Sequence, residues 1–100
     1  MKPRGRPKKY RIVKDHPKIR QFSPRGKPGR PDEVELTTEE FEAIRLADCQ
    51  EKDQEKAARS MRVSQETFSR ILKKAHSKVS DALVNGKIIR IQGGNFLIES

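Results

Sequence analysis

The chain has 100 residues, of which 32% are hydrophobic and 37% charged, and its formal net charge is +9. This length fits one small domain, and the low apolar content predicts that only part of the chain forms its core. No apolar run approaches the roughly 20 residues that span a bilayer, and the basic start lacks the apolar core of a secretory signal. We therefore expect a cytoplasmic protein that makes no membrane contact. Cys49 stands alone, so it excludes an intrachain disulfide and is expected to be a small packing residue.

The positive charge is concentrated in the first third of the chain. Residues 1–31 hold twelve Lys or Arg side chains and one acid, whereas residues 32–100 hold eleven basic and thirteen acidic side chains. All six prolines also lie in residues 1–31, and each disfavours a continuous helix or strand ladder. We predict that residues 1–31 form a basic, largely extended or flexible arm that is attracted to a polyanion.

The arm begins with KPRGRPKK at residues 2–9, which resembles an AT-hook. In such a motif Arg-Gly-Arg lies in a narrow minor groove, because glycine lets the backbone approach the groove floor and the flanking prolines turn away from it. The alternative is a basic tail that touches only phosphates. The predicted DNA contacts of the arm are Arg4, Gly5, Arg6, Lys8 and Lys9.

The first predicted helix spans about residues 38–50. The sequence TTEE at residues 37–40 is typical of a capping box, with Thr37 as N-cap and Glu40 at the third helical position. Leu36 and Phe41 have the spacing of a hydrophobic staple around this start. Order is therefore expected to begin near Thr37.

Two further helices and a hairpin complete the predicted domain. Asp53 can cap a helix over 54–61, and Ser64 can cap a longer helix that ends at Asn85-Gly86. The runs KIIRIQ and NFLIE on either side of Gly93-Gly94 then predict a β-hairpin within residues 87–100. The expected fold is mostly α, with a DNA-binding domain over 32–86, a hairpin tail over 87–100 and the arm in front.

Only three residues separate the second and third predicted helices. In a helix-turn-helix, the two helices cross so closely that a small residue must lie at the contact and a hydrophobic residue must fill the turn. Ala58 and Val63 occupy these positions. Arg62 stands where such turns usually place glycine, so a positive φ there would cost roughly 1 to 2 kcal/mol.

The helix that begins after Ser64 is the predicted reading element. Phe68 and Ile71 face inward, which turns a polar set of side chains toward solvent. The side chain of Gln65 can pair with an adenine edge, and that of Arg70 can pair with a guanine edge. The lysines, including Lys78, suit backbone phosphates. The alternative is an ordinary solvated helix face. The predicted major-groove contacts are Ser64, Gln65, Glu66, Thr67, Ser69, Arg70, Lys73 and Lys74.

The stretch LADCQEKDQEKAARSMRVSQETFSRILKKAHSKVSDALVNGKIIRIQGG, which starts at Leu46, resembles domain of unknown function family 134 (uncharacterised protein family 0251). These small predicted DNA-binding proteins are similar to region four of sigma factors. The resemblance extends upstream through LTTEEFEAIRLAD and covers most of the chain. It implies a sigma region-four-like helix-turn-helix and a role in transcription regulation. This sequence departs from the family pattern at Arg62, Asp53 and Cys49 and after Gly94.

The sequence predicts a transcription regulator that reads double-stranded DNA selectively, is associated with the nucleoid and contacts the transcription machinery. Because one short helix gives limited affinity, we expect a homodimer joined through the second half of the third helix or the hairpin edge. Residues 32–55 carry ten acids and two bases, whereas residues 56–90 carry nine bases and two acids, and this polarity would orient docking. No phosphate-binding glycine loop, nucleophile motif or metal-ligand spacing occurs, so we predict no enzyme, cofactor or metal. His16 and His76 are expected at the surface.

Two alternatives from other classes remain. The first is a non-specific RNA or nucleoid binder that acts mainly through the arm. The second is a protein-interaction adaptor in which the exposed helix face meets another protein.

Overall fold

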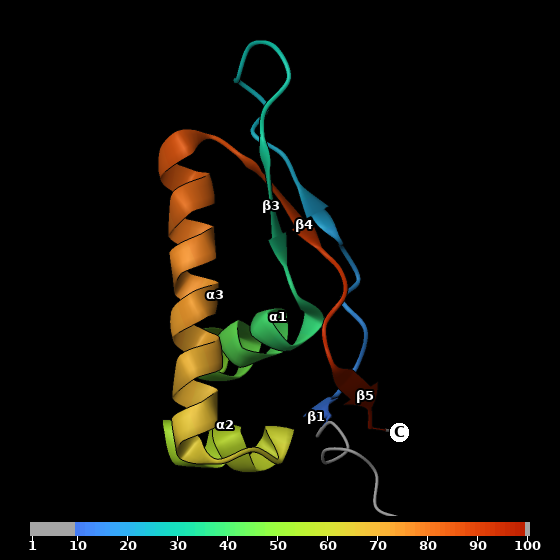
Figure 1. Ribbon diagram of the computed structural model, residues 1–100, viewed down its shortest axis with the longest axis vertical. Helices are drawn as coiled ribbons and strands as arrows, with labels where there is room; N and C mark the ends of the chain where they lie inside the picture. Colours follow the sequence, from blue (N-terminus) through green and yellow to red (C-terminus); the bar gives the residue numbers. More distant parts are fainter. Residues whose placement is uncertain (1–9, 100) are drawn as a thin grey trace, which may run out of the picture.

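The computed structural model describes residues 10–99, and the AT-hook-like segment lies outside this range. Three helices form the main body (Figure 1). They are α1 (Thr38–Ile44), which continues as a π-helical turn η1 (Arg45–Cys49), then α2 (Gln54–Met61) and α3 (Gln65–Asn85). The three predicted helices are thereby confirmed.

Each helix begins at the predicted cap. The Thr37 hydroxyl accepts the Glu40 N–H, and the Glu40 carboxylate accepts the Thr37 N–H, which completes the capping box. Asp53 accepts the N–H of Lys56, and Ser64 accepts the N–H of Thr67. These contacts satisfy backbone donors that have no partner inside the helix, and so they fix where α1, α2 and α3 start.

Two apolar clusters hold the helices and strands together. In the first, Leu46, Met61 and Phe68 are almost fully buried, and Ala57 and Ala58 allow α2 to approach its neighbours closely. The second cluster joins α3 to the strands through Ala75, Leu36 and Ile91, and Phe41 packs against it as the predicted staple requires. One side of α3 is therefore packed from Phe68 to Val79.

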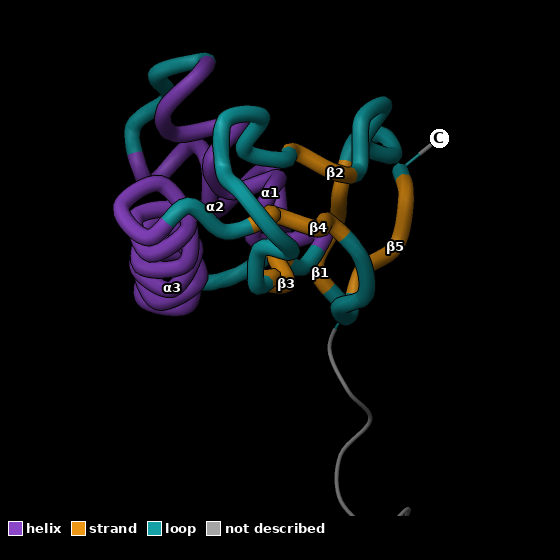
Figure 2. The backbone as a smooth tube through the Cα atoms, turned by 90° about the horizontal axis from the view of Figure 1, so that it is seen from above, coloured by secondary structure: helices purple, strands orange, loops and turns teal. Residues whose placement is uncertain are grey.

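Strand β4 (Ile88–Ile91) lies at the centre of a three-stranded sheet of order β2-β4-β3. It runs parallel to β3 (Glu33–Leu36) and antiparallel to β2 (Gln21–Phe22). A separate pair is formed by β1 (Arg11–Val13) and β5 (Phe96–Ile98), which run parallel. Viewed from above, the helices occupy one side of the molecule and the strands the other (Figure 2).

The predicted C-terminal hairpin is wrong, because β4 and β5 do not pair. Both edges of β4 are already filled by β2 and β3. Gly93 and Gly94 have positive φ and lead the chain away, so that β5 reaches β1 instead. The two strands after Gly86 therefore belong to different sheets.

The expectation that no packed element precedes Thr37 is also wrong. Val13 in β1 is completely buried, and β2 pairs with β4. The two strands have three and two residues, and no proline lies within either of them. Residues 11–22 are thus part of the domain and do not belong to a separate arm.

Arg62 has a φ of 57°, in the left-handed region that is costly for a residue with a Cβ atom. We expect Arg62→Gly to raise the free energy of unfolding by about 1 kcal/mol, since glycine removes the steric cost of this conformation. Arg62→Ala serves as the control because alanine keeps the Cβ atom. Denaturant unfolding measures both variants, and an Arg62→Gly variant no more stable than Arg62→Ala would contradict the explanation.

Candidate nucleic-acid interface

The turn between α2 and α3 consists of Arg62, Val63 and Ser64. The Val63 N–H donates to the carbonyl of Ala58, and the Arg62 N–H donates to that of Arg59, a pattern that closes a helix around a left-handed residue. Val63 packs against the first apolar cluster, which contains Ala58. Hydrogen bonding and packing therefore hold α3 at a fixed angle to α2.

The predicted contact residues come together on one exposed face at the start of α3. Gln65, Glu66 and Arg70 are exposed, as are Ser69, Lys73 and Lys74, while Thr67 is half-buried. On the opposite side of the helix, Phe68 is fully buried and Ile71 nearly so. The rest of the described chain does not cover this face. Residues 53–75 form two helices and not one continuous rod.

Three of the predicted hydroxyl contacts already have partners. The Ser64 hydroxyl caps α3 and donates to the hydroxyl of Thr67. The Ser69 hydroxyl donates to Gln54 of α2 over 2.6 Å. The Ser69 contact joins α3 to α2, and the Ser64 contacts fix the start of α3. Among residues 10–99, the side chains of Gln65, Arg70, Lys73 and Lys74 donate no hydrogen bond and keep their donors available.

A polar hollow of about 310 Å³ lies along one flank of this exposed face. Thr67, Arg70 and Lys74 line it together with Arg11 of β1 and the carboxylates of Glu39 and Glu40. Sequence reasoning missed Arg11, since it treated the residue as part of an unstructured arm. The run Ile12-Val13 after it was the available signal for a short strand.

The carboxylates at the start of α1 are buried. Glu40 is 5% exposed and binds the ammonium group of Lys78 at 2.7 Å. The charge of Lys78 is therefore compensated within the domain. Glu39 accepts the Asn95 N–H, and burial raises the pKa of its carboxyl above the ordinary value.

The remaining candidate residues lie apart from this face or beside it. His16 and His76 are exposed as predicted, and His76 contacts Asp48 at 2.7 Å. Cys49 is exposed rather than packed, because η1 turns it away from the core.

Residues 10–99 include no helix long and apolar enough to cross a membrane. Over the same residues, no three His, Cys, Asp or Glu side chains gather as a metal site.

The described residues thus form a small domain of three helices and short strands with a basic face on α3. Residues 1–99 match the model of a protein family of unknown function, DUF134. The chain belongs to this family. No solved structure matches it.

Three relatives illustrate the range of the family. A UPF0251 protein of Thermoanaerobacter pseudethanolicus is 51% identical over 94 residues, which cover 93% of this chain and 80% of the relative. A UPF0251 protein of Methanococcus maripaludis is 46% identical, with 95% and 74% covered. A UPF0251 protein of Prosthecochloris aestuarii is 50% identical over 90% of this chain but only 59% of its own length. Some relatives are therefore considerably longer.

The substitution Glu39→Gln tests how much the buried Glu39 carboxylate, beside the exposed start of α3, lowers the free energy of unfolding. Because the pKa of Glu39 is raised in the folded state, the folded protein retains a proton that the unfolded chain has already released. As the pH rises from the pKa of Glu39 in the unfolded chain to its higher pKa in the folded protein, the contribution of this group to the free energy of unfolding therefore falls. We expect Glu39→Gln to be more stable than the parent at neutral pH, with the gain shrinking at acid pH, since glutamine can still accept the Asn95 N–H.

Unfolding curves at neutral and acid pH measure this difference, and the exposed strand residue Glu35 provides the control variant Glu35→Gln. A Glu39→Gln variant that is less stable than the parent at neutral pH would contradict this prediction, because it would show that the charged carboxylate stabilises the fold.

Proposed function

We propose that the protein binds double-stranded DNA sequence-selectively through a sigma region-four-like helix-turn-helix formed by α2 and α3, as a regulator of transcription. The observation that carries this proposal is the exposed start of α3. Gln65, Arg70, Lys73 and Lys74 project from a helix whose opposite side is buried against α2 and α1. A helix supported in this way fits the major groove, where base edges differ in their donors and acceptors.

The position of Arg11 supports a joint role for the helix and the basic arm. Arg11 lines the same hollow as Thr67, Arg70 and Lys74, so the chain that precedes it starts beside the proposed reading face. Residues 2–9 carry five Lys or Arg side chains, and an extended segment of that length spans roughly 25 Å. The arm can therefore reach an adjacent minor groove while α3 occupies the major groove.

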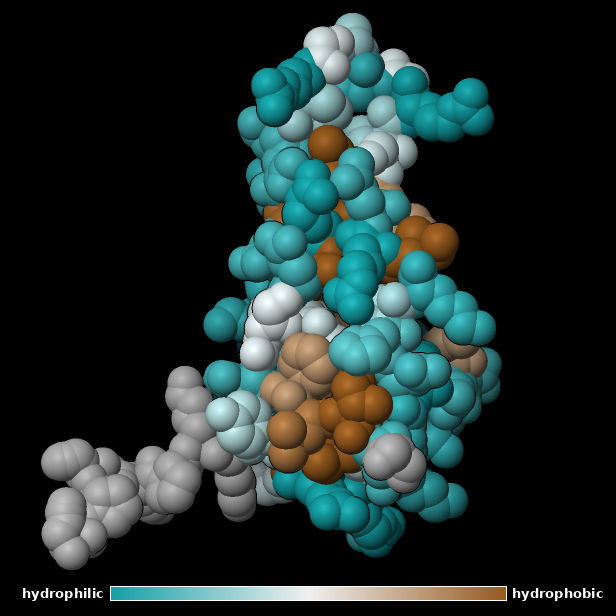
Figure 3. Space-filling view, turned by 90° about the vertical axis from the view of Figure 1, so that its right-hand side faces the viewer, coloured by the Kyte–Doolittle hydropathy of each residue, from teal (hydrophilic) through white to brown (hydrophobic). Residues whose placement is uncertain are grey.

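A homodimer forms part of the proposal. Leu83 and Val84 in the second half of α3 are 75% and 81% exposed, which is unusual for adjacent large apolar residues. Within residues 10–99 the outer edge of β5 has no strand partner, and apolar side chains gather over the lower part of the face where β1 and β5 lie (Figure 3). Two copies would present two reading helices and would select a DNA site with two-fold symmetry.

Arg70→Ala and Lys73→Ala separate base reading from phosphate contact. We expect Arg70→Ala to cost about 1 to 3 kcal/mol on the preferred site and to relax its sequence, because arginine reads a guanine edge with two hydrogen bonds. Lys73→Ala should weaken binding to all sequences alike and reduce the salt dependence. Selection from random duplexes, followed by binding measurements at several salt concentrations, compares the two variants. Equal losses on every sequence for both would contradict the assignment.

Deletion of residues 1–9 distinguishes this proposal from the alternative of a non-specific RNA or nucleoid binder that acts mainly through the arm. The deletion ends before Arg11, so β1 and its pairing with β5 are retained. We expect weaker binding with the sequence preference preserved, because α3 supplies the selectivity. Complete loss of binding would favour the non-specific RNA or nucleoid binder, and a full-length chain without salt-dependent DNA affinity would favour the protein-interaction adaptor.

A further inference from the structure

A second basic surface lies on α2, away from the proposed reading face. It is a groove of about 460 Å³ between α2 and η1, and we call it the α2 groove. None of the residues predicted to read DNA lines it. Its lining contains five basic side chains and no carboxylate, and consists of Lys14, Arg45, Leu46, Gln50, Lys52, Lys56, Arg59 and Ser60.

The orientation of α2 separates the groove from α3. Lys56 and Arg59 are three residues apart and share one helix face. Gln54 lies toward α3, where it accepts a hydrogen bond from Ser69, and Ala57 and Ala58 are buried in the core. A ligand in the α2 groove would therefore leave the exposed start of α3 uncovered.

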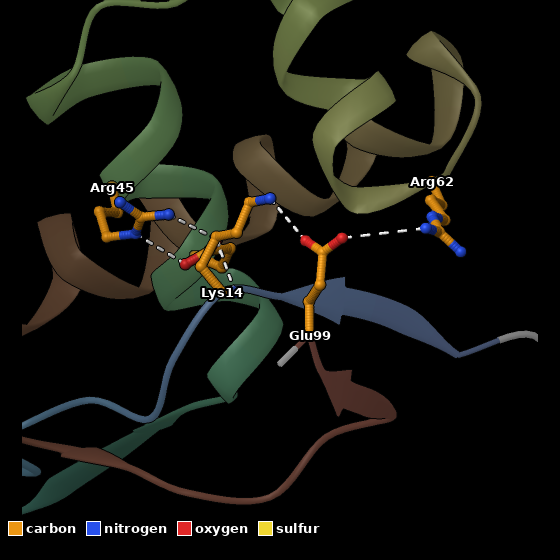
Figure 4. A network of polar contacts seen from close by, with 5 residues as sticks. Lys14, Arg45, Arg62 and Glu99 are labelled. Carbon is orange, nitrogen blue, oxygen red and sulfur yellow. Dashed lines mark hydrogen bonds and ion pairs between the residues drawn. The ribbon is translucent and has the colours of Figure 1, made fainter.

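The basic side chains of the groove fall into two groups. Lys14 and Arg45 already bind carboxylates, Glu99 and the buried Glu42 respectively (Figure 4). Lys52, Lys56 and Arg59 make no ion pair within residues 10–99. The second group thus gives the groove an uncompensated positive charge.

The walls of the groove are held in place. Glu42 accepts two hydrogen bonds from the Arg45 guanidinium, at 2.8 and 2.7 Å, and one from the Lys14 N–H. This contact joins the end of β1 to α1. At the other end the Lys52 N–H donates to the carbonyl of Leu46, which fixes the linker before α2. The basic side chains therefore surround a hollow built from three segments of the chain.

The positive charge of the α2 groove contrasts with the acidic stretch of sequence that supplies part of its lining. Residues 32–55 contain ten acids and only two bases, Arg45 and Lys52, and both bases line the groove. The nearby carboxylate of Asp53 does not line it and instead caps α2. The fold thus gathers the few bases of an acidic segment with Lys14, Lys56 and Arg59 on one concave surface.

We propose that the α2 groove binds a small phosphate-rich anion. Lysine and arginine donors suit phosphate oxygens, whereas the one apolar lining residue, Leu46, is only 1% exposed. The lining contains no aromatic side chain on which a base could stack, so the phosphate chain alone would be recognised. A bound anion would bridge β1, the linker and α2. This inference does not depend on the proposed DNA binding.

Isothermal titration of the full chain with inorganic tripolyphosphate at low salt tests the proposal. We expect saturable binding that weakens as salt is added, and equal affinity for ATP because the adenosine has no site. The double variant Lys56→Gln/Arg59→Gln should bind roughly tenfold or more weakly, since it removes two charge-assisted hydrogen-bond donors to the phosphate oxygens. Thermal unfolding should show the same pattern, with tripolyphosphate stabilising the parent chain and not this variant.

Two control variants remove the same charge elsewhere in the full chain. They are Lys73→Gln/Lys74→Gln on α3 and Arg4→Gln/Arg6→Gln in the arm, and both should retain the affinity of the parent. Absence of saturable binding, or an equal decrease in affinity for all three double variants, would overturn the proposal. A Lys56→Gln/Arg59→Gln variant with weaker affinity for duplex DNA but unchanged affinity for tripolyphosphate would assign these side chains to a nucleic-acid surface and overturn it as well.

Discussion

The close contact of α2 with its neighbours determines the arrangement of the whole domain. Ala57 and Ala58 are almost completely buried and allow α2 to lie directly against the cluster that contains Phe68. The turn at Arg62 can then be short, because its two N–H groups close α2 and Val63 fills the space beneath it. A larger side chain at Ala58 would push α2 outward and change both the angle of α3 and the shape of the α2 groove.

The features predicted correctly are those that depend on neighbours in the sequence. The caps at Thr37, Asp53 and Ser64 are contacts across three residues. The buried face of α3 follows from helical spacing alone. Local rules therefore determined the helices and the exposed start of α3 to within a few residues.

The features predicted wrongly depend on pairing between distant segments. Two apolar runs around Gly93-Gly94 favour a hairpin when they are considered alone, but β3 and β2 occupy both edges of β4. The strand β1 could not be identified from three residues in a proline-rich segment, because its stability comes from β5 and from the burial of Val13. For the same reason the sequence did not indicate that Arg11 lies beside α3, or that Arg45 and Lys52 share a groove with Lys14.

The distribution of carboxylates explains how one small basic domain keeps two separate cationic surfaces. Glu39, Glu40 and Glu42 are buried at the start of α1, where Glu40 neutralises Lys78 and Glu42 neutralises Arg45. These pairs stabilise the contact of α1 with α3 and β1 without covering the exposed bases. The start of α3 and the α2 groove therefore remain positively charged on opposite sides of α2. Because α2 forms one wall of the groove and supports α3, an anion that restrains α2 would act on the same contact that sets the angle of α3.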